Sequence, residues 1–403
     1  MKIKKKIFIY FQNMPNYLFE YDLYMNLNTH SNLQEYLSSV LKTSVEYKQV
    51  IFNNRKYAHI TFQTSCKSDI EELNNHYIKI LSHHNITVKH HRIIYLGIRN
   101  YRFTHFIYKL LLTSNLKPSI INTIINDQKI MTIYDQVFTH KSVSTNNYEF
   151  YEFYGDVTLN KAVVMYICNK FKHLNKPTGV AVLTRVKHNL ISKRYFAKFA
   201  EELDFWKYIS ISLKKKQTNM KRTLEDVFES FFGATEMILN TYIKKGIGFY
   251  FCSKMIFTIL SKQTISLSYN VVVDAVTRLK ELVDVYGDLQ KTNDKYLKKL
   301  NDEQKSLFEL IQIEKDYISF LKYSKPVRRY FPNGLGKIVY KNDKEPIENS
   351  DFFKHKMTIF LCGKYIATGT ASIKQDAKQN VSEKVLEYLK RMNIIKPTPN
   401  YYT

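Results

Sequence analysis

Two segments with helical spacing carry clustered carboxylates among residues that are otherwise apolar enough to be buried. In "NNYEFYEFYGDVTLNK" three acids fall at i, i+3 and i+7 on one helical face: Glu149, Glu152 and Asp156. In "TLEDVFESFFGATEMIL" Asp226 and Glu229 again stand at i, i+3. Buried carboxylates are costly unless they are paired or bind a metal. The chain must therefore fold so that each cluster meets solvent, a cation or a partner.

If the two helices pack with these faces together, they present four oxygen-bearing side chains to a hard divalent ion such as Mg²⁺. Each cluster by itself is equally well explained as a solvated stripe. Both clusters lie among Phe and Tyr residues, however. This shared setting favours metal binding.

The chain as a whole is strongly basic, which indicates a polyanionic partner. Its 403 residues include 61 Lys and Arg against 36 Asp and Glu, for a formal net charge of +25. Such an excess favours nucleic-acid binding. The length is too great for one typical core and predicts two to four domains.

The four cysteines are far apart and form no C-x-x-C pair. This spacing argues against a zinc site or a disulfide framework and fits a reducing compartment. No apolar run approaches the roughly 18 residues needed to span a bilayer. The apolar run after the basic start is also too short for a signal peptide. We therefore expect an intracellular, most simply cytoplasmic, protein with no membrane partner.

The patterns predict a multidomain α and α+β protein. Residues 1–98 alternate strand-like and helix-like stretches in the order βαββαβ, which is the ferredoxin-like arrangement, beginning with the strand-like "KKIFIYF". Residues 99–265 are mostly helical, interrupted by a lysine-rich loop, "SLKKKQTNMKR". Residues 266–395 read as one helix, a charged helical insertion at about 289–323, three strands and a final helix.

The central domain resembles the catalytic domain of ribonuclease III. "VFTHKS", "YEFYEFYGD", "VLTRVKHNLISKRYFAKFAEELDFWKYI" and "LEDVFESFFGA" occur in that family's order and approximate spacing. The resemblance implies that four acids bind the catalytic metal: Glu152, Asp156, Asp226 and Glu229. Glu149 falls at the auxiliary acid that opens the family signature.

The resemblance also implies hydrolysis of double-stranded RNA with Mg²⁺, for which Mn²⁺ could substitute, by a homodimer in which each site cuts one strand. Phe153 would be a knob at the dimer interface, or equally a core residue. His140 matches the family too, and we interpret it as structural. Val180 and Ala181 stand where the family has an auxiliary Glu-Gly pair.

The C-terminal domain resembles a double-stranded RNA-binding domain, on "DAVTRLKELVDVYG" and "HKMTIFLCGKYIATGTASIKQDAKQNVSEKVLEYL". The resemblance implies that Glu281 contacts the minor groove. Lys374, Gln375 and Lys378 would form a phosphate clamp at a helix N-terminus, which itself favours anions. Such domains recognise the shape of A-form RNA across successive minor grooves.

The N-terminal domain resembles an RNA-recognition motif on "RKYAHITF". Strand alternation places Tyr57 and His59 on one face, where Phe8 would join them as a stacking platform for unpaired bases. A ferredoxin-like module that docks a protein or dimerises, without touching RNA, explains the pattern equally well.

The sequence thus predicts a Mg²⁺-dependent endoribonuclease for double-stranded RNA. The alternatives are a non-catalytic relative that serves as an RNA-binding or ribosome-structural scaffold, and a decoy that sequesters duplex RNA. Neither alternative needs four clustered acids. The presence of all four favours the enzyme.

Overall fold

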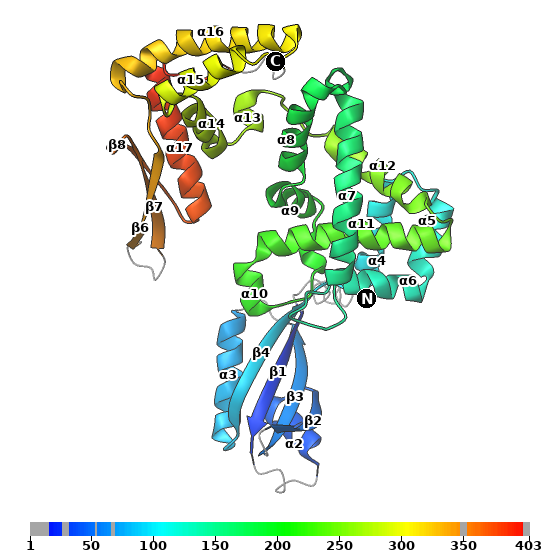
Figure 1. Ribbon diagram of the computed structural model, residues 1–403. Helices are drawn as coiled ribbons and strands as arrows, with labels where there is room; N and C mark the ends of the chain where they lie inside the picture. Colours follow the sequence, from blue (N-terminus) through cyan, green and yellow to red (C-terminus); the bar gives the residue numbers. More distant parts are fainter. Residues whose placement is uncertain (1–15, 26–31, 53–54, 66–68, 347–352, 398–403) are drawn as a thin grey trace, which may run out of the picture. The chain divides into compact units, whose positions relative to one another are not determined.

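The computed structural model describes five stretches of the chain, residues 16–25, 32–52, 55–65, 69–346 and 353–397. The chain divides into two compact units (Figure 1): Met1–Lys172 with Lys187–Thr264, and His173–Val186 with Ile265–Thr403. Among the described residues, no helix is both long enough and apolar enough to cross a lipid bilayer.

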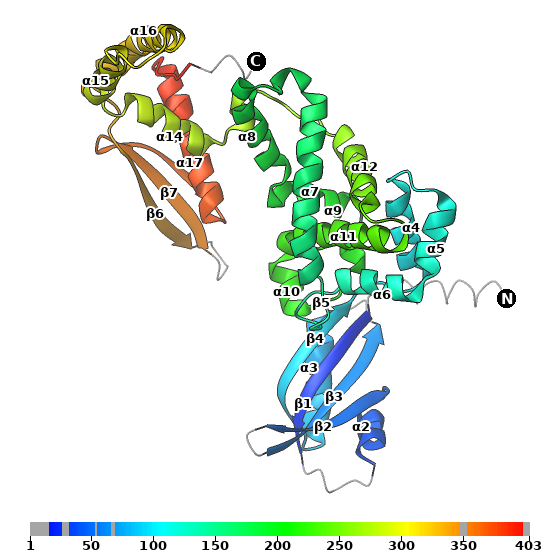
Figure 2. The ribbon, with the colours of Figure 1, turned by 45° about the vertical axis from the view of Figure 1, so that its right-hand side comes forward.

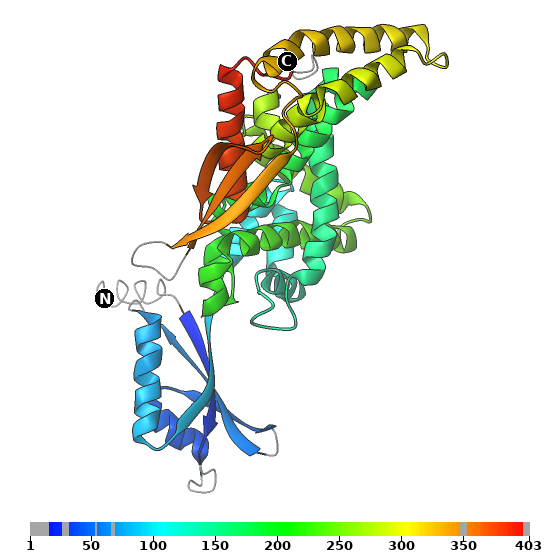
Figure 3. The ribbon, with the colours of Figure 1, turned by 60° about the vertical axis from the view of Figure 1, so that its left-hand side comes forward.

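The first unit begins with an antiparallel sheet in the order β2-β3-β1-β4-β5. Two helices pack against it, and Figure 3 shows them on the same side of the sheet. The four long strands are β1 (Asn16–Tyr24), β2 (Val45–Phe52), β3 (Arg55–Ser65) and β4 (Thr87–Leu96). The helices are α2 (Leu33–Leu41) and α3 (Ile70–His83).

The first strand of the sheet within the described residues is β1. The "KKIFIYF" stretch, residues 5–11, lies outside the described residues, and the sheet takes its first strand from "NYLFEYDLY". That segment alternates strictly: Phe19, Tyr21 and Leu23 are fully buried under the helices. Its charged residues point to the opposite face, because successive side chains of a strand alternate.

The face of the sheet that the helices leave open carries paired charges. Arg92 Nε lies 2.5 Å from Glu20 Oε2, across the β1–β4 pair. His59 Nδ1 lies 2.7 Å from Asp22 Oδ1, across the β1–β3 pair. On this face acidic and basic side chains of neighbouring strands therefore meet.

A short strand from the helical domain extends this sheet. β5 (Ile211–Ser212) pairs with the end of β4, and Figure 2 shows it there. The segment predicted as a lysine-rich loop forms a short helix directly after it, α10 (Leu213–Thr218). The Lys216 ammonium lies 3.4 Å from the centroid of the Tyr95 ring on β4. Sheet and helical domain are thus joined by backbone pairing and by a cation–aromatic contact.

The helical domain is built around α11 (Met220–Tyr242), whose middle is buried on all sides. Figure 1 shows α7 (Glu149–Lys170) crossing it. The other helices are α4 (Tyr101–Leu112), α5 (Pro118–Asn126), α6 (Gln128–Val137), α9 (Lys193–Glu202) and α12 (Ile247–Ser261), together with the last residues of α8 (Val180–Leu190), whose residues up to Val186 belong to the second unit. Phe228 and Phe231 of α11 pack on Phe205 in the interior, with ring centroids 5.9 and 5.8 Å apart.

The second unit has a three-stranded antiparallel sheet in the order β6-β7-β8. A short helix, α13 (Tyr269–Val272), leads into it. The strands are β6 (Ile338–Pro346), β7 (Phe353–Leu361) and β8 (Lys364–Ala371). The helices α14 (Ala275–Tyr286) and α17 (Lys374–Arg391) pack against the sheet through a shared apolar core.

The predicted helical insertion consists of α15 (Leu289–Leu300) and α16 (Leu307–Tyr330), which Figure 3 shows side by side. It was expected to end near residue 323, but α16 continues to Tyr330. The reason is that Phe320 and Val327 are buried in the core of the unit. The last turns of α16 therefore belong to the core as well as to the insertion.

Candidate active site

Two glycines bring α7 and α11 into backbone contact. A Cβ atom at Gly155 would lie 1.9 Å from the Glu229 carbonyl oxygen, and one at Gly233 would lie 2.2 Å from the Tyr151 carbonyl oxygen. No side chain fits at either position without moving one of the helices. This close crossing sets the acid-bearing faces of the two helices against each other.

An open cavity of about 820 Å³ lies over this crossing. Three of the carboxylates that line it come from α7 and two from α11: Glu149, Glu152, Asp156, Glu225 and Glu229. The rest of the lining is Phe153, Val157, His188, Ile191 and Ser192. The structure thus gathers in one place acids that are about seventy residues apart in the sequence.

Asp226 lies beside the cavity rather than in its wall. It is buried, and the Tyr148 hydroxyl donates a hydrogen bond to its Oδ2 at 3.1 Å. Its charge nevertheless raises the pKa of both Glu152 and Glu229. All five acids predicted from the sequence therefore belong to one electrostatic cluster. The sequence reasoning missed a sixth, Glu225.

Burial and mutual repulsion raise the pKa values of two acids in the cluster. Burial raises the pKa of Glu229 to about 8, and the charges of Glu225, Asp156, Glu152 and Asp226 add to this effect. Burial together with Asp226 and Glu149 raises the pKa of Glu152 to about 7, although Lys141 and Arg222 oppose the shift. Near neutral pH these carboxyls hold protons that a neighbouring cation would displace.

Besides Asp226, two further acids of the cluster have polar partners that orient them. Lys141 Nζ lies 2.6 Å from Glu149 Oε1, so Glu149 is ion-paired at the rim. Asn160 Nδ2 donates to Asp156 Oδ1 at 2.9 Å. Glu149 is thus compensated within the protein to a degree that Glu152 and Glu229 are not.

The donor set fits a hard divalent cation. Every ionisable ligand from α7 and α11 is a carboxylate, which is the ligand that Mg²⁺ and Mn²⁺ prefer over nitrogen or sulfur. Within the described residues, no three His, Cys, Asp or Glu side chains stand close enough to enclose a metal ion by themselves. Mg²⁺ commonly keeps several water molecules in protein sites, so a cation here would share its coordination with water.

His140 has structural contacts. Its ring is buried, with Nδ1 2.9 Å from both the Ser142 hydroxyl and the Ser142 backbone nitrogen, and the ring packs edge-on against Tyr148. Burial lowers its pKa to about 4, with the charge of Lys141 acting in the same direction. A neutral imidazole in such contacts stabilises the turn before α7.

The ribonuclease III domain family matches residues 149–237, the segment that contains both acid-bearing helices. A protein provisionally named ribonuclease 3 from Invertebrate iridescent virus 6 is 28% identical over 324 residues, covering 77% of this chain and 95% of the relative. A second, provisionally named ribonuclease 3 from Frog virus 3, is 36% identical over 182 residues, covering 44% of this chain and 48% of the relative.

The chain carries a match to the ribonuclease III domain, and these similarities support its assignment as a ribonuclease III-type endonuclease. Its enzymatic class is therefore that of an endoribonuclease. The solved nuclease domain of ribonuclease III from Campylobacter jejuni is 24% identical, with a TM-score of 0.30, and the match covers 39% of this chain and 97% of that domain. The chain spans about half the length of the Frog virus 3 relative and of the ribonuclease 3 from Lactobacillus acidophilus.

Within the ribonuclease III domain, Phe153 is 75% exposed. It lies in the wall of the acid cavity, next to Val157. The interpretation of Phe153 as a core residue is therefore wrong, because the side chain faces solvent. Val180 and Ala181, at the start of α8, are also exposed and are absent from the cavity wall.

The predicted RNA contacts of the second unit differ in exposure and in partners. Lys374 and Gln375 are exposed at the N-terminus of α17, where no side chain caps the helix. Lys378 Nζ lies 4.5 Å from the centroid of the Tyr340 ring. Glu281, in contrast, is largely enclosed and accepts hydrogen bonds from Tyr269 and from Lys396, at 2.6 and 2.8 Å.

The predicted stacking platform is described only in part. Phe8 lies outside the described residues, and Tyr57 lies on β3. His59 is on the open face of the sheet but is bound to Asp22. The binding partner of this face stays a prediction.

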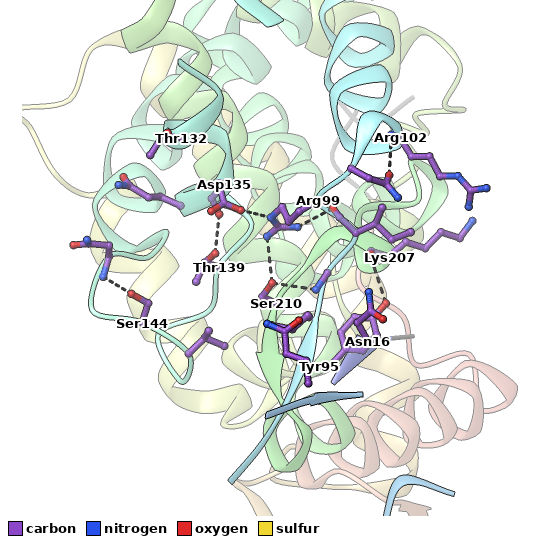
Figure 4. Close-up of a pocket in the computed structure, with 18 residues that line it drawn as sticks. Asn16, Tyr95, Arg99, Arg102, Thr132, Asp135, Thr139, Ser144, Lys207 and Ser210 are labelled. Atoms are coloured by element: carbon purple, nitrogen blue, oxygen red, sulfur yellow. Dashed lines mark hydrogen bonds and ion pairs between the residues drawn. The ribbon is translucent and has the colours of Figure 1, made fainter. Parts of the chain in front are cut away.

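A second cavity of about 1060 Å³ lies where the sheet joins the ribonuclease III domain (Figure 4). Arg99 stands at its centre and is paired with Asp135. The remaining guanidinium donors reach the carbonyl oxygens of Ile98, Tyr208 and Phe138. The Arg99 guanidinium therefore holds together the sheet and the ribonuclease III domain where they join.

Proposed function

We propose that the protein is a metal-dependent endonuclease that hydrolyses double-stranded RNA as a homodimer. The observation that carries this proposal is the facing of carboxylates from α7 and α11 in one open cavity. A scaffold or a decoy would gain nothing from this arrangement, because carboxylates that face one another in a shared cavity repel and destabilise the fold.

Four residues would hold the divalent cation, Mg²⁺ or in its place Mn²⁺: Glu152, Asp156, Asp226 and Glu229. When bound, the cation supplies an activated water and neutralises charge on the phosphate. Tyr148 and Asn160 hold Asp226 and Asp156 in position. Glu149, ion-paired with Lys141 at the rim, would act through this network as an auxiliary acid.

Exposed apolar residues on α7 support the homodimer. Phe150, Phe153 and Val157 share a face that solvent reaches, and two of them also line the acid cavity. Covering such a patch with a second copy would remove apolar surface from water. The same contact would bring two cavities together, one for each strand of a duplex.

We propose that the second unit is a double-stranded RNA-binding domain with a helical insertion, and that the N-terminal module is ferredoxin-like. The order of helix, three antiparallel strands and helix supports the first assignment, and the βαββαβ order with β1 central supports the second. Lys374 and Lys378, with Gln375, would bind phosphates at the α17 N-terminus. Glu281 would contact the minor groove once its present hydrogen bonds are exchanged.

The deciding experiment is incubation of the purified full chain with a labelled, long, perfectly paired RNA, in Mg²⁺ and in chelator. We expect cleavage to short duplexes with 3′ overhangs in Mg²⁺ or Mn²⁺ and none in chelator. Equal cleavage in chelator would overturn the metal requirement. No cleavage with either cation would overturn the proposed activity, and light scattering would test the dimer separately.

Duplex binding is tested by replacing both clamp lysines, Lys374→Ala with Lys378→Ala. RNA binding releases fewer counterions when a phosphate contact is lost. The slope of log affinity against log salt should therefore flatten by about one for each contact removed. Lys384→Ala is the matched control, because this lysine lies on the same helix but donates to the Thr368 carbonyl oxygen. An unchanged slope in the double variant would rule out the clamp.

A further inference from the structure

The cavity of about 1060 Å³ between the sheet and the ribonuclease III domain, here called the junction cavity, is lined mainly by polar side chains (Figure 4). Its walls come from β1, β3 and β4 of the sheet, from α4 and α6, and from the segment that precedes α7. Five of the lining side chains are carboxamides: Asn16, Gln63, Asn100, Gln136 and Asn146. Such a lining suits a ligand that forms several hydrogen bonds.

Three of the carboxamides use their carbonyl oxygen for a hydrogen bond within the protein. Asn16 Oδ1 accepts from the Ser65 hydroxyl at 2.5 Å, and Gln136 Oε1 accepts from the Tyr151 hydroxyl at 3.2 Å. Asn100 Oδ1 caps the N-terminus of α4. The other polar group of each of these side chains is an NH₂, which only donates. The junction cavity therefore offers a ligand more donors than acceptors.

The charges around the junction cavity also favour an anion. Asp135 is the one carboxylate among the described residues that line it, and it is paired with Arg99. Arg102 and Lys207 add two cations to the lining, and Figure 4 shows their side chains extending to the same side. Burial raises the pKa of Tyr208, and the charges of Lys207 and Arg102 both oppose that shift, so the two cations lie near one hydroxyl group.

Both cations already have partners, which an anion can replace. Lys207 Nζ lies 2.8 Å from Asp204 Oδ1 in an exposed pair three residues apart. Arg102 Nε donates to the Tyr101 hydroxyl at 3.4 Å. Exposed contacts of this kind contribute little to stability, so exchanging them for a more highly charged group has a small cost.

The junction cavity lies close to the acid cavity. Asn146 lines the junction cavity, and Glu149, three residues later, lines the acid cavity. Three residues of chain span at most about 11 Å between Cα atoms. The two walls are also joined by Gln136, whose carbonyl oxygen is bound to Tyr151 of α7. One strand of RNA can therefore contact both cavities.

We propose that the junction cavity binds backbone phosphates of the RNA strand next to the acid cavity, an inference that rests on the proposed function. Phosphate oxygens are negatively charged acceptors, which matches a lining of amide and cationic donors. Arg102 and Lys207 would neutralise the phosphate, and the carboxamides would position it. Part of the wall belongs to the N-terminal sheet, so this module would bind substrate without selecting a base sequence.

The test is binding of the full chain to a labelled, perfectly paired RNA in chelator, over a series of salt concentrations. Lys207→Gln should weaken binding by about tenfold and flatten the slope of log affinity against log salt by about one. Lys198→Gln is the matched control: Lys198 is paired with Glu202, is similarly exposed and does not line the junction cavity. The control should keep the wild-type slope. A wild-type slope in Lys207→Gln would overturn the inference.

Asn146→Ala gives a second readout that does not involve charge. Asn146 is exposed, and its backbone nitrogen rather than its side chain is bound to Ser144, so the variant should fold with an unchanged thermal midpoint. We expect about fivefold weaker duplex binding with the wild-type salt slope, because a donor to phosphate is lost without a charge. Thr145→Ala, at an exposed position outside the cavity wall, is the control and should bind as the wild type does. Wild-type affinity in Asn146→Ala would contradict the inference even if Lys207→Gln does not fold.

Inorganic phosphate distinguishes a small anion from an RNA strand as the occupant. If it raises the thermal midpoint of the wild type but not of Lys207→Gln, while both bind the duplex equally, the cavity takes small anions and the inference is wrong. If the wild type cuts duplex RNA in Mg²⁺ and Lys207→Gln binds it as tightly, only this inference fails. If the wild type neither binds nor cuts duplex RNA, the proposed function fails as well.

Discussion

The open face of the N-terminal sheet and the cavity between α7 and α11 both gather carboxylates, but they treat them in opposite ways. On the sheet, Glu20 meets Arg92 and Asp22 meets His59 across neighbouring strands. In the cavity, Glu152 and Glu229 face other acids, and the pKa of each is raised by burial and by those acids.

The charged side chains on the sheet are neutralised by partners within the fold. The carboxylates in the cavity face one another and would be neutralised by a bound cation. Paired surface charges contribute little and need no ligand. Facing carboxylates destabilise the protein unless a cation joins them, and perturbed carboxyls of this kind cluster at functional sites. The same residue type thus has a structural role on the sheet, whereas in the cavity we propose that it binds a metal ion.

The largest expected effect comes from removing one charge in the cavity. Glu229→Gln should lower the rate of duplex cleavage by about three orders of magnitude, because preorganised charge at a reacting centre contributes on that scale. It should also raise the thermal midpoint in chelator, since the repulsion is relieved. Cleavage assays and thermal unfolding of the same preparation measure both. A variant that still cuts a long duplex in Mg²⁺ would contradict the site.

The next largest effect is expected from a substitution at the crossing of α7 and α11, which creates the cavity. Gly155→Ala places a Cβ atom 1.9 Å from the Glu229 carbonyl oxygen, so α7 and α11 must separate. We expect a loss of about 3 kcal/mol in the free energy of unfolding, typical of overpacking, together with loss of cleavage. Denaturant titration measures the first effect.

A glycine in open space is the control for this substitution. Gly246 has a φ of 86° and no neighbouring atom within 4 Å of an added Cβ. Gly246→Ala should cost only about 1 kcal/mol, for the left-handed conformation, and should keep activity. Equal losses in the two variants would mean that the crossing is not the cause.

Sequence patterns predicted the parts of the site that depend on helical spacing. The spacing predicted that one helical face carries Glu149, Glu152 and Asp156, and that another carries Asp226 and Glu229. Glu225 was missed because adjacent helical residues point in different directions, so its place next to Asp226 set it apart from the pair. Its i, i+4 spacing to Glu229 is the signal that could have found it.

The parts that failed depend on contacts between distant segments. β5 has only two residues and becomes a strand because it pairs with β4, more than a hundred residues earlier. The strand "NYLFEYDLY" was not predicted, although its half-buried side chains have the alternation that such a strand requires.

The pH dependence of stability should distinguish the cavity from the rest of the protein. The pKa values of Glu152 and Glu229 are raised to about 7 and about 8, so the folded state binds more protons than the unfolded chain and its stability falls as pH rises to about 8. His140, with its pKa lowered to about 4, acts oppositely, but only up to its ordinary value of 6.5. The informative window is pH 6.5 to 8.

In this window the thermal midpoint in chelator should fall by about 3 °C, and Mg²⁺ should abolish the fall by replacing the protons. Glu229→Gln should flatten the pH dependence of the thermal midpoint, because it removes the carboxyl that has the higher pKa of Glu152 and Glu229. A midpoint that rises with pH in chelator would show that the cavity acids are compensated in another way.

The smallest expected effect is the same Glu→Gln substitution made on the sheet. Glu20→Gln removes the ion pair with Arg92 but keeps an oxygen that can accept a hydrogen bond, so it should lower the free energy of unfolding by less than about 1 kcal/mol. Cleavage should not change. Denaturant titrations in chelator compare its sign with that of Glu229→Gln, which should stabilise. If both substitutions shift stability in the same direction, the two regions do not differ in how they compensate charge, and the repulsion assigned to the cavity is wrong.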